Sequence, residues 1–414
     1  MSESSSVGAP ALRVAMALGG TDRGRSGIST VVRSVLAGLR KSLQGRGGSL
    51  VAFGAEADRA AFATELAGVE WRETPRAFDR PGPNALWHLF RSGPLAARLG
   101  ADVLLLPAAN RRLTAFSPIP TVAVVHDLAQ LRVSAKFDRL RMFYAKHVLV
   151  SAMASATELV AVSEATRTDL REALSCPAHP IRLIPNGVDT SRFSAPSAGD
   201  PRIAAARDSL ALHGPYLLYP ARLEHPGKNH LRLLQAFAQS AAASKHKLVL
   251  AGADFGGGEF IRREVARLGI GHRVRTLGFL PEPLLPGLVA GADAVMMVGL
   301  HEGFGLPALE ALAAGRAVAA ANTGALPEVT GHLAALCDPR SVESIGRALD
   351  RALADESLRT LALAEGPTWA AARSWNKTVD GLVAACVSAA AAERERFSNC
   401  NKSHSILRRA RSST

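Results

Sequence analysis

The sequence is poor in cysteine and contains no long hydrophobic run. Its four cysteines lie far apart and form no CxxC pair; they are Cys176, Cys337, Cys386 and Cys400. This spacing argues against a disulfide framework or a zinc site and is typical of the reducing cytoplasm. The start of the chain lacks a signal-peptide pattern, and no apolar run reaches the roughly 18 residues of a membrane-spanning helix. We therefore expect a cytoplasmic protein that at most contacts the inner face of the plasma membrane peripherally.

Aromatic side chains are scarce as well, at 5% of the chain. No run of Arg and Lys is interleaved with aromatics and no zinc-finger spacing occurs, so we expect no nucleic-acid partner. Asp, Glu and His do not cluster at ligand spacings, which predicts that no essential metal is bound. The sequence also lacks a GxSxG motif and any Cys/His arrangement typical of a catalytic nucleophile.

Positive charge and hydrophobic residues are both plentiful. Lys and Arg total 49 against 36 Asp and Glu, a net charge of +13, and 48% of the 414 residues are hydrophobic. The length favours two or three domains with buried cores. The positive excess suits a partner that carries phosphates, whether a nucleotide, a nucleic acid or an anionic membrane surface, and the charge alone does not choose among them.

Short apolar strands alternate with helical patterns in two successive rounds. Apolar runs occupy residues 12–18, 50–53, 102–106, 122–125, 158–162 and 181–184, and then 216–219, 247–251, 274–277, 294–298 and 317–320. Strands this apolar, separated by helices, are typical of parallel sheets covered on both faces. The predicted fold class is α/β, with two facing, doubly wound, Rossmann-like domains. Ligands of such sheets bind beyond the carboxyl ends of the strands, in the cleft between the domains.

Composition also suggests the domain boundaries. The predicted N-terminal domain covers residues 1–187, a stretch rich in Ser, Pro and Gly follows, and the C-terminal domain covers 212–370. An Ala-rich helix over 371–392 precedes a basic tail at 393–414 that we expect to be disordered. A further helix is expected over 132–150, with a basic stripe that includes Arg132, Lys136 and Arg139. This stripe fits contact with an anionic membrane, and it equally fits a half-buried helix with a solvated basic face.

The densest motif follows the apolar strand at 293–298. Gly303 and Gly305 allow a tight loop, and Pro307 suits the first turn of a helix whose free N–H groups favour a phosphate. Glu302 precedes this helix and Glu310 lies within it. Carboxylates repel phosphate, so the expected targets of the two glutamates are hydroxyl groups, such as those of ribose and a sugar. An isolated glutamate is more often a solvated or paired surface residue, but here the strand, the glycines, the proline and the second glutamate occur together.

Two cations stand after the apolar strand at 216–219. Arg222 and Lys228 lie on a loop that Pro226 and Gly227 allow to turn. Permanent cations at the end of a strand are able to neutralise the negative charge that grows on a diphosphate leaving group where no metal is held. Two exposed cations on a surface loop would account for the same pattern taken alone.

Together these motifs resemble glycosyltransferase family 4, whose members are retaining enzymes of the GT-B fold that use nucleotide sugars. The pattern comprises Arg222 and Lys228 followed by Glu302 and Glu310 within EGFGLPALEALAAG. Further matches are PNGVD at 185–189, VSEA at 162–165, LGFL at 277–280 and VHDL at 125–128. The similarity runs in order from about residue 11 to about residue 390 and is specific as an ordered set.

The resemblance implies a role for each of these groups. Glu310 would hold the ribose hydroxyls, Glu302 the hydroxyls of the donor sugar, and Arg222 and Lys228 the diphosphate. His126 would lie beside the donor sugar, near the acceptor. The other implied donor-binding positions are the backbone N–H groups of Gly303, Phe304 and Gly305, the nucleobase neighbours Phe279 and Leu280, and the phosphate-approaching loop at Gly19 and Gly20. One departure is that five residues separate Arg222 from Lys228, where the family usually has four.

The expected function is transfer of a hexose from a nucleotide sugar to a glycan or lipid-linked glycan, with no cofactor. The resemblance is strongest to bacterial mannosyltransferases of surface-polysaccharide assembly, which makes GDP-mannose the first candidate donor. A nucleotide-sugar epimerase of the same two-domain shape stays an alternative, as does a non-catalytic binding protein. A nicotinamide-dependent oxidoreductase is a poorer alternative, because no GxGxxG motif opens the first helix.

Overall fold

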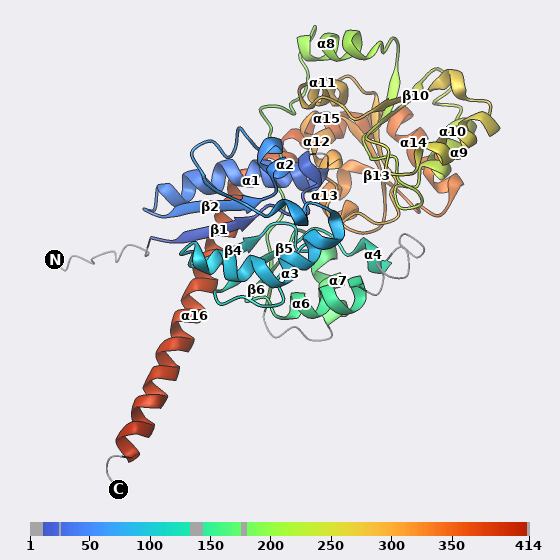
Figure 1. The fold of residues 1–414 in the computed structure, drawn as a ribbon. Coiled ribbons are helices and arrows are strands. Elements are labelled where there is room, and N and C mark those ends of the chain that lie inside the picture. Colours follow the sequence, from blue (N-terminus) through green and yellow to red (C-terminus); the bar gives the residue numbers. More distant parts are fainter. Residues whose placement is uncertain (1–10, 25, 133–143, 175–179, 412–414) are drawn as a thin grey trace, which may run out of the picture.

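The computed structural model describes residues 11–24, 26–132, 144–174 and 180–411, and these build two parallel sheets (Figure 1). The first sheet has the strand order β3-β2-β1-β4-β5-β6-β7 and the second the order β10-β9-β8-β11-β12-β13. The strands of the first are β1 Arg13–Ala17, β2 Ser49–Gly54, β3 Glu70–Glu73, β4 Val103–Leu106, β5 Thr121–Val125, β6 Glu158–Ala161 and β7 Ile181–Leu183. Those of the second are β8 Tyr216–Tyr219, β9 Lys247–Ala251, β10 Val274–Gly278, β11 Ala294–Met297, β12 Ala317–Ala321 and β13 Ala334–Cys337. The predicted pair of Rossmann-like α/β domains is confirmed.

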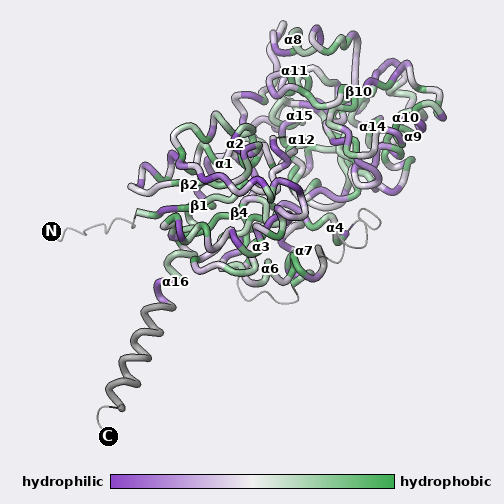
Figure 2. Tube along the Cα trace, viewed as in Figure 1, coloured by the Kyte–Doolittle hydropathy of each residue, from purple (hydrophilic) through white to green (hydrophobic). Residues whose placement is uncertain are grey.

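The central strands are apolar because both of their faces are covered. Every residue of β5, β8 and β11 is buried, and Figure 2 shows hydrophobic residues along β1 and β4. In each sheet the order reverses beside the first strand, between β1 and β4 and between β8 and β11. Ligands of doubly wound sheets bind at such reversals, beyond the carboxyl ends of the strands. We therefore expect the loops after β1 and β8 to contribute to a ligand-binding site.

Helices cover both sheets. In the first domain they are α1 Gly27–Gln44, α2 Glu56–Ala61, α3 Pro81–Arg98, α4 Ala129–Arg132, α6 Val150–Ala154 and α7 Glu164–Leu174. In the second they are α8 Pro201–Leu210, α9 His230–Gln239, α10 Gly258–Arg267, α11 Leu285–Ala290, α12 Leu306–Ala313, α13 Leu326–Thr330, α14 Val342–Ala354 and α15 Glu356–Ala371. α1 illustrates why these segments are helical. The Ser26 side chain caps the helix by accepting from the Ser29 N–H, and the apolar stripe of the helix faces the sheet.

Several elements were not predicted from the sequence, among them β3, α3, β13 and α8. β3 is a largely exposed edge strand with the sequence EWRE, so it shows no apolar alternation. α3 contains several Pro and Gly residues that suggest a loop, yet Pro81 sits at its first turn, where proline is tolerated. β13 is a four-residue strand with no flanking pattern. α8 lies inside the expected linker and packs against α11, so this segment adds to the second domain ahead of residue 212.

The C-terminal helix differs from expectation at its far end. α16, Trp375–Arg411, crosses to the first domain, where Val379 packs against Gly38 of α1 and the Thr378 hydroxyl donates to the Pro185 carbonyl over 2.8 Å. The tail at 393–414 was expected to be disordered, but the helix continues to Arg411 and projects from the body (Figure 1). No Gly or Pro interrupts the sequence after Gly381, and Ala, Glu, Arg and Leu favour a helix there.

Most of the helix expected over 132–150 lies outside the described residues. The parts that are described are α4, a π-helical turn at Tyr144–Leu149 and α6. Arg132, at the end of α4, pairs with Asp169 and Glu172 of α7. This member of the predicted basic stripe is therefore held by the protein itself.

Candidate functional site

Arg222 stands at the topological reversal of the second sheet, on the loop that follows β8. Its guanidinium lies over the Phe255 ring, 4.5 Å from the centroid, and its Nη2 is 3.1 Å from Glu224 Oε2. Asp22, which follows β1 of the first domain, places Oδ2 3.7 Å from Arg222 Nη1. The predicted cation is thus oriented by an aromatic face and reaches the opposite domain.

Lys228 and Glu302 meet although 74 residues separate them. The Lys228 Nζ donates to both carboxylate oxygens of Glu302, over 2.7 and 2.9 Å. The two loops are also joined through their backbones, because the Leu300 N–H donates to the Gly227 carbonyl over 2.9 Å. The additional residue between Arg222 and Lys228 therefore leaves Lys228 beside Glu302. The family resemblance implies that the two side chains hold different parts of a ligand, and nothing in the sequence predicts that they pair.

The loop after Glu302 brings backbone N–H groups to the start of α12. Gly305, with φ of 95°, occupies the cap position, and no side chain caps this helix in the described part of the chain. This φ would strain any residue with a side chain, and a Cβ here would also lie 2.6 Å from Leu326 Cδ2, so glycine is favoured at this position. Phe304 is buried beside it. The uncapped helix start leaves N–H donors that favour an anion.

Glu310 is a buried carboxyl group one turn inside α12. It is only 7% exposed, and burial raises its pKa to about 7; the charge of Glu282 acts in the same direction and Arg192 opposes it. No described residue donates a hydrogen bond to the Glu310 carboxylate. A ligand with hydroxyl groups would supply the donors that this carboxylate lacks.

His126 follows β5 of the first domain and approaches the second. Its ring Nε2 lies 2.7 Å from the Pro107 carbonyl oxygen, which assigns the proton to that nitrogen. Burial lowers the pKa of the imidazole, so the ring is neutral at physiological pH. A Cβ at Gly303 would clash with the His126 carbonyl oxygen, so glycine is required for this close approach. Asp127 caps the next turn by accepting from the Ala129 N–H.

The remaining predicted residues are divided between the two domains. Gly19 lies against the His88 ring, and Gly20 has a φ of 82° and accepts from Arg111 over 3.1 Å. Phe279 is 57% exposed, whereas Leu280 is partly buried against the core. The Phe279 side chain is therefore accessible to a ligand, while that of Leu280 also serves packing.

Matches of two segments of the chain to family models decide the family. Residues 25–192 match the family described as Glycosyltransferase Family 4, and residues 205–365 match the one described as Glycosyl transferases group 1. The chain belongs to the family 4 glycosyltransferases. The GT-B fold of this glycosyltransferase agrees with solved structures. Anabaena HepE in complex with UDP and glucose gives a TM-score of 0.70 at 20% identity, over 91% of this chain and 100% of that one. WaaG, a glycosyltransferase involved in lipopolysaccharide biosynthesis, gives 0.67 at 15% identity, over 89% and 97%.

Relatives with curated names include enzymes for different sugars. The O-antigen chain mannosyltransferase B of Escherichia coli is 30% identical over 61% of this chain and 66% of its own length. The 2-deoxystreptamine glucosyltransferase of Streptomyces kanamyceticus is 28% identical over 69% of this chain and 70% of its own. The match to the E. coli mannosyltransferase WbdA is 29% identical and covers 64% of this chain but only 33% of WbdA. This glycosyltransferase therefore spans about two thirds of the first two relatives.

Sequence reasoning missed several charged partners in this glycosyltransferase. Asp22 pairs with both Arg111 and Arg222, and Glu282 pairs with Arg33 over 2.9 Å and with Arg192 over 3.0 Å. The position of Asp22 directly after the Gly19–Gly20 loop was the available sequence pattern for it. The Glu282 contacts join segments 90 and 249 residues apart, so no local pattern indicates them.

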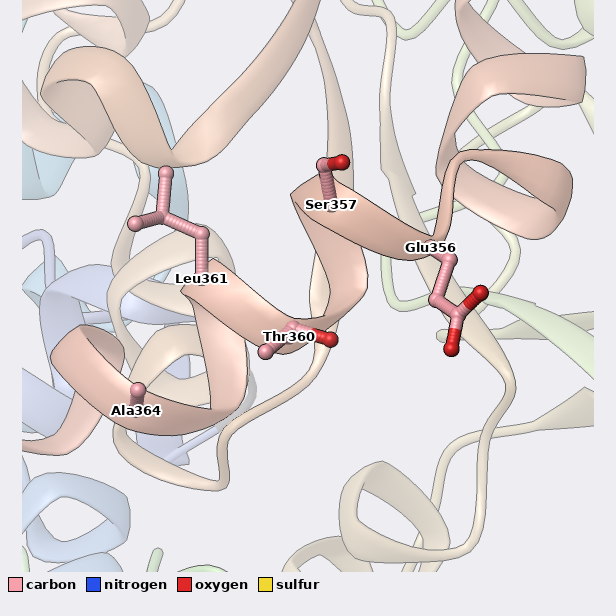
Figure 3. A pocket seen from close by; sticks show the side chains of 5 residues that line it. All are labelled: Glu356, Ser357, Thr360, Leu361 and Ala364. Carbon is pink, nitrogen blue, oxygen red and sulfur yellow. The ribbon is translucent and has the colours of Figure 1, made fainter.

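Other features of this glycosyltransferase lie apart from these residues. A hollow of about 400 Å³ lies on α15 and is lined by Glu356, Ser357, Thr360, Leu361 and Ala364 (Figure 3). None of the predicted site residues lines it. The described His, Cys, Asp and Glu side chains form no group of three that could hold a metal ion. No helix in the described ranges combines the length and the apolarity needed to cross a membrane.

Proposed function

We propose that this protein transfers a hexose, with retention of anomeric configuration, from a nucleotide diphosphate sugar to a glycan or lipid-linked glycan. The observation that supports this proposal most is the arrangement around α12. Lys228 and Glu302 pair directly before the start of α12, and Glu310 lies buried behind it. Among the described residues, no side chain caps this helix start and none donates a hydrogen bond to the Glu310 carboxylate. Arg222 lies on the same loop as Lys228 and faces the other domain. This combination fits a diphosphate with a sugar on each side.

Each group has a chemical task in this proposal. Arg222, Lys228 and the N–H groups at the start of α12 neutralise the negative charge that grows on the leaving diphosphate. Glu302 accepts from hydroxyls of the donor sugar, and Glu310 accepts from the ribose hydroxyls. The bond from the anomeric carbon to the diphosphate breaks and the bond to the acceptor oxygen forms on the same face. The leaving phosphate takes the proton of the acceptor hydroxyl, so that no protein nucleophile and no metal is required.

His126 and the first domain complete the site. The neutral imidazole, held at Nε2 by the Pro107 carbonyl, would lie against the donor sugar and next to the acceptor. The contact of His126 with Gly303 supports a role for the two facing domains in excluding water, which would otherwise hydrolyse the donor.

GDP-mannose is the donor that we propose first. The support comes from the relatives named mannosyltransferases, and the named glucosyltransferase and the neighbour bound to UDP and glucose make UDP-glucose the comparison. We propose a role in bacterial polysaccharide assembly in the cytoplasm, with at most peripheral contact with the membrane.

Incubation with labelled GDP-mannose and UDP-glucose tests the proposal. We expect release of nucleoside diphosphate and of free sugar by slow donor hydrolysis, and faster release when a suitable glycan is present. Turnover of UDP-glucose alone would contradict the mannose assignment. An isomerised free nucleotide sugar would indicate an epimerase, and an intact donor in every combination would indicate a non-catalytic binding protein.

A further inference from the structure

One face of α7 in the first domain meets the glycine loop of the second domain. Ser163 stands at the start of this helix, and Thr166 and Asp169 follow at intervals of three residues, so the three side chains lie on one face. All three contact residues 301–303, directly beside Glu302. This set, Ser163, Thr166 and Asp169, is called the α7 face below.

The two hydroxyl groups of the α7 face converge on one carbonyl. Ser163 Oγ donates to the Gly303 carbonyl over 2.6 Å, and Thr166 Oγ1 donates to the same oxygen over 3.1 Å. Ser163 Oγ in turn accepts from the Thr166 N–H over 3.0 Å, which fixes its position. Both side chains are buried. A carbonyl oxygen has two lone pairs, so the Gly303 oxygen is fully used by the first domain.

Two further contacts hold the same helix against the second domain. Asp169 Oδ2 lies 3.1 Å from Nε2 of His301, next to Glu302 in the chain. The Glu328 carboxylate of α13 accepts from the N–H groups of Glu164 and Ala165, over 3.0 and 3.1 Å. Arg132 holds Asp169 from the other side. The polar contacts of the α7 face are thus concentrated on the loop that carries Glu302.

Planarity of the peptide bond links these contacts to the proposed donor site. The Gly303 carbonyl and the Phe304 N–H belong to one trans peptide unit, so they point in opposite directions. Fixing the carbonyl toward α7 therefore turns the Phe304 N–H away from α7. Thr166 Oγ1 is also 3.4 Å from the His126 carbonyl oxygen, so the same hydroxyl lies between the backbone of His126 and that of Gly303.

We propose that Ser163 and Thr166 are positioning residues for the transfer reaction, which set the orientation of the Gly303–Phe304 peptide from the opposite domain. The inference rests on the proposed function. In this proposal the two hydroxyls do not contact the nucleotide sugar. They act through the peptide whose N–H faces the negative charge that grows on the leaving diphosphate. They therefore link the position of the first domain to the orientation of the Phe304 N–H in the loop that would bind the donor sugar nucleotide.

The double variant Ser163→Ala/Thr166→Val tests this inference. It leaves Arg222 and Lys228 in place, so we expect the dissociation constant of GDP, measured by calorimetry, to change less than about threefold. We expect kcat for GDP-mannose to fall about tenfold or more, because two hydrogen bonds that orient a charge-stabilising group are lost. The single variant Thr166→Ser, in which Ser163 is unchanged, keeps both hydroxyl groups. We expect it to retain most of the wild-type kcat.

Thr330→Val is the matched control. The Thr330 hydroxyl is buried and donates to the Leu326 carbonyl over 2.8 Å, so its removal costs a similar hydrogen bond but leaves both bonds to the Gly303 carbonyl in place. We expect its kcat to equal that of the wild type. Equal losses of kcat in Thr330→Val and in the double variant, or an unchanged kcat in the double variant, would overturn the inference.

Hydrogen exchange supplies a readout that needs no turnover. The amides of residues 303–306 exchange faster in the double variant than in the wild type, while amides of β8 and β11 are unchanged. Unchanged exchange at 303–306 would overturn the inference. If the wild type turns over none of the tested nucleotide sugars, the proposed function fails, and the exchange result still decides whether the α7 face orders this loop.

Discussion

The buried carboxyl of Glu310 should give folding stability and ligand affinity opposite dependences on pH. Burial raises the pKa of Glu310 from 4.5 to about 7. The folded state therefore binds this proton more tightly than the unfolded state, and stability falls as the pH rises from about 4.5 to about 7. The difference corresponds to about 3 kcal/mol in the free energy of unfolding, fully lost above pH of about 7. Glu310→Gln carries no charge and should be spared this loss.

Urea unfolding of the wild type and Glu310→Gln at several pH values measures this effect. The free energy of unfolding of the variant should rise relative to that of the wild type by about 2.5 kcal/mol between pH 5 and pH 8. The comparison cancels the other titrating groups. Glu302→Gln is the matched control, because it makes the same replacement at a glutamate that is paired. It removes the ion pair with Lys228 and should therefore lower stability at pH 8, whereas Glu310→Gln should raise it. A constant difference between wild type and Glu310→Gln across this range would refute the burial argument.

Donor binding should depend on pH in the opposite sense. Ribose hydroxyls donate to the ionised carboxylate, so the affinity of the wild type for GDP should rise from pH 6 to pH 8 and level off above the pKa of Glu310. Glu310→Gln should bind GDP at least tenfold more weakly at pH 8 and lose this pH dependence, since an amide oxygen is a weaker acceptor than a carboxylate. A wild-type affinity that is flat from pH 6 to pH 8 would show that ligand hydroxyls do not bind there.

Three other predictions follow from single features. Arg222→Ala should lower kcat/KM about a hundredfold, and Arg222→Lys should recover only part of it because the stacking on Phe255 is lost; unchanged turnover would remove the diphosphate role. Gly303→Ala should abolish turnover by forcing the loop away from His126, whereas Gly346→Ala, in open space on α14, should keep activity and gain about 0.5–1 kcal/mol. EDTA should leave turnover unchanged, and a loss restored by a divalent ion would contradict the metal-free mechanism.

The fold was largely predictable because buried parallel strands are continuous apolar runs. β5 and β11 are fully buried and stood out in the sequence, whereas the exposed edge strand β3 did not. α3 escaped because Pro and Gly usually mark turns, although a first-turn proline is compatible with a helix. The basic charge of the tail after residue 393 suggested disorder, whereas the helix preference of its Ala, Glu, Arg and Leu residues agrees with the continuation of α16 to Arg411.

The candidate site was predictable only where its chemistry is local in the sequence. Arg222 and Glu310 were found because each lies next to a strand end or a glycine loop. The pairing of Lys228 with Glu302 and the contact of Ser163 with Gly303 join segments 74 and 140 residues apart. The first contact depends on how two loops of the second sheet meet, and the second on how the two domains face each other. No spacing in a single sequence encodes either geometry.

A crystal structure of the protein with GDP-mannose would show where the diphosphate, the ribose and the mannose bind. We expect the diphosphate between Arg222, Lys228 and the start of α12, with the ribose hydroxyls on Glu310 and the mannose beside Glu302. A diphosphate bound out of reach of both Arg222 and the α12 N-terminus, or a ribose away from Glu310, would contradict this arrangement.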